Sequence, residues 1–94
     1  MDIVYASLHR MSADAAADDE VPEVLDILWA HTVAADGLEH VSGRVEADRV
    51  DLLLFLAPQA PTAPLSAGDR AAALLARCHR ASPLMRHRYL PPRP

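Results

Sequence analysis

The 94-residue chain has little of several residue types, and each shortage excludes a class of protein. A single cysteine excludes an internal disulfide framework and a multi-cysteine zinc site. The unbroken apolar runs of the chain, such as residues 52–57, fall far short of the roughly 20 residues that a membrane-spanning helix needs. With three glycines, none of them clustered, the chain has no glycine-rich phosphate loop. No basic segment followed by an apolar one opens the chain, so we expect a cytoplasmic protein without an export signal.

Bulky core residues are also scarce. The chain has one Phe, one Trp and two Tyr against 18 Ala, and lysine is absent, so that all nine basic residues are Arg. This composition indicates a high-GC bacterial source. We expect one domain over residues 1–90 and a disordered tail at 91–94. Because so small a core holds few large side chains, we expect the domain to gain stability by pairing with another chain.

The hydrophobic pattern predicts six elements of secondary structure, four strands and two helices. In the first of them, alternation places Tyr5 and His9 on the face opposite Val4 and Leu8. The first helix would end at Gly37, which favours a left-handed stop, and the second would start at a capping sequence at Ser66. The expected elements are a strand at 2–11, a helix at 18–37, two strands at 38–58 that turn near 46–48, a helix at 66–81 and a strand at 85–90.

This βαββαβ order predicts the α+β class and a ferredoxin-like α/β plait, with an antiparallel sheet and both helices on one sheet face. The third predicted strand is apolar on both faces, with Leu53 and Phe55 pointing away from the helices. That second face needs a cover, so we predict a homodimer or a complex with a protein partner. Leu53 and Phe55 would lie at this interface, with Tyr89 from the last strand. An edge-to-edge sheet through residues 85–90 is the alternative geometry.

Polar side chains give weaker indications of a site. Tyr5, His9 and Asp51 would share the open sheet face, where they suggest a small-molecule site or a cofactor-free enzyme as an alternative function. No two of the five histidines have the i, i+4 spacing of a helical metal pair, so we expect neither a metal nor another cofactor. Cys78 falls on the apolar stripe of the second helix, which favours an inert thiol. The absence of a catalytic motif favours a protein that is not an enzyme.

Charge is unevenly distributed along the chain. Residues 1–69 have a balance of −10, and residues 70–94 carry six Arg and no acid. A basic segment of this kind suggests nucleic-acid binding as a second alternative, but the acidic remainder would repel a polyanion. Pairing of the basic end with the acidic part of this chain or of its dimer mate is the favoured interpretation. The basic patch would comprise Arg77, Arg80, Arg86 and Arg88.

Together these patterns predict a small accessory, adaptor or regulatory protein. It would act by homodimerisation and protein–protein association, without catalysis and without a membrane segment.

Overall fold

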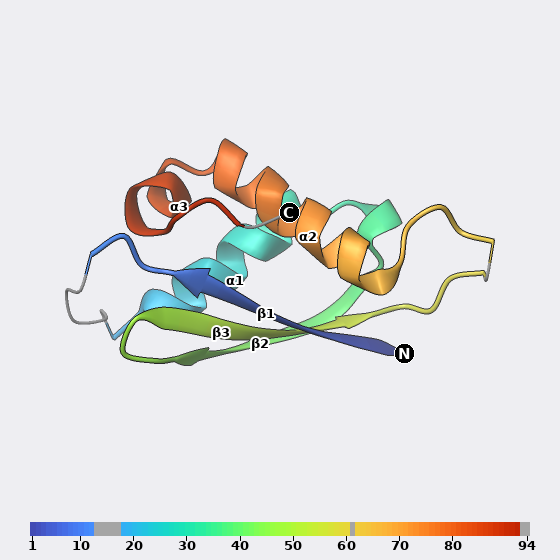
Figure 1. Ribbon diagram of the computed structural model, residues 1–94, viewed down its shortest axis with the longest axis horizontal. Coiled ribbons are helices and arrows are strands. Elements are labelled where there is room, and N and C mark those ends of the chain that lie inside the picture. Colours follow the sequence, from blue (N-terminus) through green and yellow to red (C-terminus); the bar gives the residue numbers. More distant parts are fainter. Residues whose placement is uncertain (13–17, 61, 93–94) are drawn as a thin grey trace.

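The structure is a computed structural model that describes residues 1–12, 18–60 and 62–92. The predicted tail at 91–94 is described only at Pro91 and Pro92, which lie outside any helix or strand, and residues 93–94 are outside the described part. The elements run in the order β1 (Asp2–His9), α1 (Glu20–His31), the 3-10 helix η1 (Ala34–Asp36), β2 (Leu38–Val45), β3 (Arg49–Leu56), α2 (Ala67–Ala81) and α3 (Pro83–Arg88) (Figure 1).

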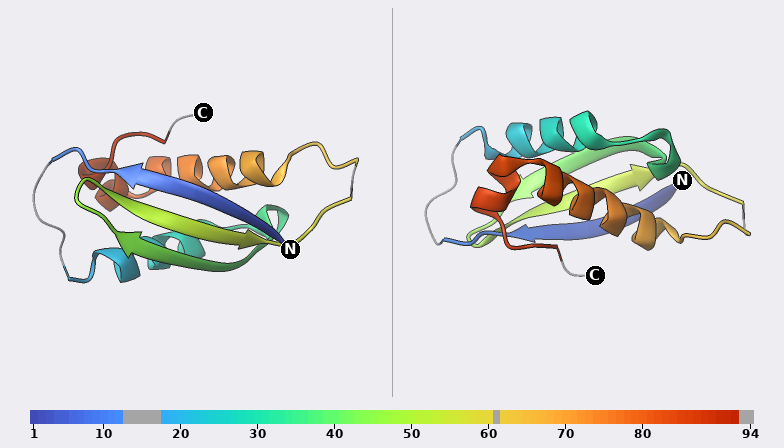
Figure 2. Two further views of the ribbon diagram at one scale, coloured as in Figure 1. Left: turned by 60° about the horizontal axis from the view of Figure 1, so that its bottom comes forward. Right: turned by 90° about the horizontal axis from the view of Figure 1, so that it is seen from above.

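The three strands form one antiparallel sheet in the order β1-β3-β2. β2 and β3 make the predicted hairpin, whose turn is closed by a 2.8 Å hydrogen bond from the Glu46 amide to the Arg49 carbonyl. An irregularity between Leu38 and His40 shifts the register of β2, so that from His40 onward its even-numbered residues share a sheet face with the odd-numbered residues of β3. Both long helices cover the same face of this sheet, and Figure 2 (left) shows the other face uncovered.

The covered face holds the core because the strand residues alternate in burial. Val50, Leu52, Leu54 and Leu56 of β3 point toward the helices and are completely buried. Each such side chain contributes about 1.5–3 kcal/mol relative to an exposed position. The helices contribute the opposing layer of buried residues: Val24 and Leu28 from α1, and Ala71, Leu74, Leu75 and Cys78 from α2.

The first helix is shorter than predicted. α1 ends at His31 because Thr32 adopts an extended backbone conformation, and Gly37 ends η1 instead. Gly37 has the predicted left-handed conformation, with φ at 69°. Trp29 of this helix is 45% exposed. The second helix starts as predicted, since the Ser66 hydroxyl accepts a 3.0 Å hydrogen bond from the Asp69 amide.

The predicted last strand is wrong, because residues Pro83–Arg88 form the helix α3. Ser82 caps it by accepting a 3.2 Å hydrogen bond from the Met85 amide, and Pro83 occupies the first helical position, where its missing donor has no helical partner. The four-residue spacing of Met85 and Tyr89 brings both side chains into the core.

The fold is therefore a mixed α+β arrangement with a three-stranded antiparallel sheet and three helices. The four-stranded ferredoxin-like plait is not confirmed, since the described residues include no fourth strand. Where that strand was expected, the described part of the chain makes a single antiparallel bridge, between Arg10 and Tyr89.

Candidate functional site

The uncovered sheet face is organised in rows across the three strands. The register places Phe55 between Ile3 and His40, and Leu53 between Tyr5 and Ser42. The next row has Asp51 between Ser7 and Arg44, and His9 lies opposite Arg49 beyond it. The face thus changes from apolar at one end to polar at the other.

The apolar end is exposed to an unusual degree for residues of its type. Ile3 and Tyr5 are each 62% exposed and Leu53 is 38% exposed. Phe55 is half-buried, and its ring lies 5.3 Å from that of His40, centre to centre. Grouped apolar side chains on a face without a covering layer are typical of a contact surface.

The polar end is centred on Asp51. Its carboxylate accepts a 2.8 Å hydrogen bond from the Ser7 hydroxyl and a 2.9 Å hydrogen bond from Nε of Arg49. Hydrogen bonding from Ser7, and then from Tyr5 and Arg49, holds the pKa of Asp51 below its ordinary value. Donors that stabilise the charged form make this carboxylate a weak proton acceptor, so it is poorly suited to act as a general base.

The three residues predicted for a small-molecule site lie on one face but do not form one cluster. Tyr5 and Asp51 line a shallow depression of about 380 Å³, together with Arg44 and Glu46 of the hairpin. His9 lies at the end of β1 and lines a different groove, which Tyr5 also borders and Asp51 does not. The site is therefore a surface with one shallow depression.

Of the predicted interface residues, Leu53 and Phe55 lie on the open face, and Tyr89 does not. Tyr89 is 1% exposed, and its hydroxyl donates a 2.6 Å hydrogen bond to Glu20. Its side chain belongs to the interior, so we leave it out of the candidate surface.

A buried polar cluster around Glu20 was not predicted. Arg10 binds the Glu20 carboxylate through two nitrogens, at 2.7 and 3.0 Å, and also donates to the backbone carbonyls of Glu46 and Ala47. Burial alone would raise the pKa of Glu20, but hydrogen bonds from Arg10 and Tyr89 lower it below the ordinary value. Glu20 lies in the first turn of α1, where the helix dipole also stabilises a carboxylate. Its contacts also join α1, the β2–β3 turn and the chain after α3.

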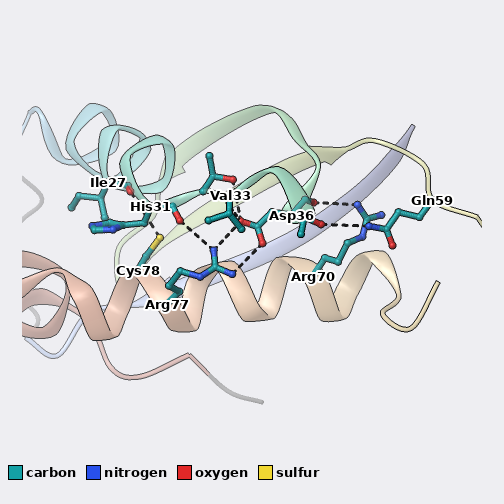
Figure 3. Close-up of polar contacts among 10 residues, drawn as sticks. Ile27, His31, Val33, Asp36, Gln59, Arg70, Arg77 and Cys78 are labelled. Carbon is teal, nitrogen blue, oxygen red and sulfur yellow. Dashed lines mark hydrogen bonds and ion pairs between the residues drawn. The ribbon is translucent and has the colours of Figure 1, made fainter.

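The basic C-terminal segment pairs with acids of the first 69 residues, as predicted. Arg77 makes two hydrogen bonds to Asp36, at 2.8 and 3.2 Å (Figure 3). Arg88 lies 3.3 Å from Glu23. Of the predicted basic patch, Arg80 and Arg86 are the exposed members. A patch whose charges are partly neutralised within the chain offers little to a nucleic-acid backbone.

Arg77 and its neighbours also hold the segment between α1 and β2 against α2. Burial alone would raise the pKa of Asp36, but hydrogen bonds from Arg77, the Val33 amide and Thr32 lower it. Nearby, Arg70 donates to the carbonyls of Asp36 and Ala57 (Figure 3). These contacts are internal, so we assign them a structural role.

Two further groups bear on reactivity. Cys78 is buried, and burial raises the pKa of its thiol to about 11, which leaves it protonated and unreactive near neutral pH. Across the described ranges, no group of three or more His, Cys, Asp or Glu side chains is placed to hold a metal ion. Within the same residues, no helix combines the length and hydrophobicity that crossing a lipid bilayer requires.

The comparisons with known proteins add no assignment: no protein-family model, no curated protein and no solved structure matches the chain.

Proposed function

We propose that this protein acts by protein–protein association through the open face of its sheet, pairing with a second copy as a small accessory or adaptor protein without catalysis of its own. The observation that supports this proposal is the exposure of Ile3, Tyr5 and Leu53 on the one sheet face that no helix covers. Sheets with such faces are stabilised when a second layer covers them.

The dimensions of the face indicate a weak association. Three strands about 4.8 Å apart and eight residues long give a footprint of roughly 14 by 27 Å. That footprint, roughly 380 Å² on each copy, is about half of the 800 Å² that a typical specific interface buries on each partner. We therefore expect a dissociation constant in the micromolar range.

The gradient along the face selects the way in which two copies stack. A twofold axis parallel to the strands brings the apolar rows around Leu53 and Phe55 together. An axis across the strands would instead set the apolar rows of one copy against Asp51 and Arg44 of the other, where charged groups would lose water without a matched partner. We propose the first arrangement, with the two sheets stacked about 10 Å apart.

The remaining parts of the proposal are the cellular setting and the full architecture. We propose a cytoplasmic protein of bacterial origin, whose β1-β3-β2 sheet is a ferredoxin-like plait in which the place beside β1 lacks its own strand. The antiparallel order of the three strands supports this architecture.

Sedimentation equilibrium of two charge variants tests the proposal. Leu53→Glu places a carboxylate in the proposed interface, and we expect it to weaken dimerisation at least tenfold. Leu65→Glu is the matched control, because Leu65 is 47% exposed and precedes α2, away from the open face. We expect this control to dimerise like the natural chain. A natural chain that stays monomeric at about 100 μM, or equal effects of the two variants, would overturn the proposal.

A further inference from the structure

Within the described residues, the outer edge of β1 has backbone groups without a hydrogen-bond partner. β1 is the edge strand next to β3, and in the described residues its outer side makes only the bridge between Arg10 and Tyr89. At this bridge the amide of Met11 donates to the Arg88 carbonyl, and the His9 carbonyl accepts from the Leu90 amide, each at 2.9 Å. Backbone groups of alternate residues point the same way along a strand. The amides and carbonyls of Tyr5 and Ser7 therefore point outward as well, beyond the bridge.

A groove of about 670 Å³ runs along this edge. Its floor is the part of β1 from Val4 to Ser7, and its far end is formed by Leu90, Pro91 and Pro92. α2 lines the other side of the groove, mostly with small side chains. The residues that α2 contributes are Gly68, Ala71, Ala72 and Leu75.

The chain itself pairs with the end of β1 at one end of this groove. Tyr89 and Leu90 pair with the end of β1, but proline has no amide hydrogen to donate, so Pro91 and Pro92 cannot continue as hydrogen-bond donors. The groove is thus a direct continuation of a strand pairing that is already established within the molecule.

We propose that this groove binds an extended polypeptide segment of a partner protein, which adds to β1 as a fourth strand. Outward-pointing backbone donors and acceptors in a row are matched by another extended backbone, and this recognition mode is known as strand addition. The edge from Val4 to His9 spans six residues, or about 20 Å. The bound segment would have apolar side chains at alternate positions, where they face Ala72 and Leu75, and polar side chains between them.

A second copy of this chain fits the groove less well than a separate segment. Edge-to-edge pairing of two β1 strands would bring a second α2 to the same side of the joined sheet, where it would compete with α2 for the space above the joint. The strand site is also separate from the open sheet face proposed for dimerisation. The strand site uses the backbone groups at the edge of β1, whereas dimerisation uses the side chains of β1 that lie on the open face.

A peptide titration tests this proposal. The probe is a capped peptide of sequence Lys-Val-Thr-Val-Thr-Val-Lys, added to the ¹⁵N-labelled full chain carrying Leu53→Glu. This substitution weakens dimerisation, so that dimerisation through the open sheet face does not affect the result. We expect the amide signals of Tyr5 and Ser7 to shift on binding. Two control peptides carry N-methyl groups on the Val or on the Thr residues. In the bound peptide, the amides of the Val residues and those of the Thr residues point to opposite edges of the strand, one toward β1 and one toward solvent. We therefore expect one control peptide to lose binding at least tenfold and the other to keep it.

Two variants of α2 complete the design. Ala72→Gln fills the groove from the α2 side and is expected to weaken peptide binding at least tenfold. Ala73→Gln is the matched control on the exposed side of the same helix and is expected to change binding less than twofold. No shift at Tyr5 and Ser7 with millimolar peptide, equal losses with both methylated peptides, or equal effects of the two variants would overturn the proposal. Protection of the two amides that rises with protein concentration, without peptide, would show a second copy on the edge and would also overturn it.

Discussion

Removal of the Tyr89 hydroxyl group tests the buried cluster around Glu20, which holds the segment that follows α3. Tyr89→Phe keeps the buried ring and deletes the 2.6 Å hydrogen bond to the Glu20 carboxylate. A hydrogen bond to a charged group contributes about 1.5–3 kcal/mol, and we expect the free energy of unfolding to fall by that amount. Each kcal/mol lowers the melting temperature of a domain this size by about 4–8 °C.

Urea unfolding followed by circular dichroism measures this change, with Tyr5→Phe as the matched control. Tyr5 is 62% exposed and its hydrogen bond to Asp51 lies at the surface, where such a contact contributes little, so its variant is expected to stay within about 0.5 kcal/mol of the natural chain. A double-mutant cycle with Glu20→Gln isolates the pair, and we expect a coupling energy of about 1 kcal/mol or more. The reasoning is refuted if Tyr89→Phe destabilises the chain no more than Tyr5→Phe.

Two more predictions concern acid stability and the turn before β2. The pKa values of Glu20 and Asp36 are lowered in the folded chain, so the stability they contribute is complete above their ordinary values of 4.5 and 3.8 and is lost as pH falls through the lower folded values. We expect the urea concentration at the unfolding midpoint to decrease when the pH is lowered from 5 to 3, and to decrease less in Glu20→Gln; an unchanged midpoint would contradict this. Gly37→Ala imposes a left-handed conformation on alanine and sets its Cβ 2.8 Å from a nitrogen of Arg70, so we expect a loss of about 1–2 kcal/mol or more in urea unfolding. The control Gly68→Ala, with no contact nearer than 3.8 Å, should stabilise α2 by about 0.5–1 kcal/mol; equal effects of the two alanines would be evidence against the argument.

Most elements could be predicted because their signals are local. Alternation identified β1 and the two faces of β3, and the Ser66 cap marked the start of α2. The last element could not be identified in the same way, because Ser82 and Pro83 are compatible both with a break and with a new helix start. Burial of Met85 and Tyr89 in a core made by distant elements decides between the two, and that information is not local.

The candidate surface was partly predictable for the same reason. Period-two alternation alone places the odd-numbered residues of β1 and β3 on one face of the sheet. The Glu20 cluster depends instead on three chain segments that meet in space, at Arg10, Glu20 and Tyr89. The groove beside β1 exists because a predicted strand is a helix, so no sequence pattern indicated it.

The most direct test of the account is an isotope-filtered NOE spectrum of a sample that mixes labelled and unlabelled chains. Such a spectrum records contacts between two copies and omits contacts within one. Association through the open face predicts intermolecular signals at the methyl groups of Leu53 and Ile3 and at the ring of Phe55. The account is contradicted if a dimeric sample has no signals at these residues, or has them only at residues outside the open sheet face.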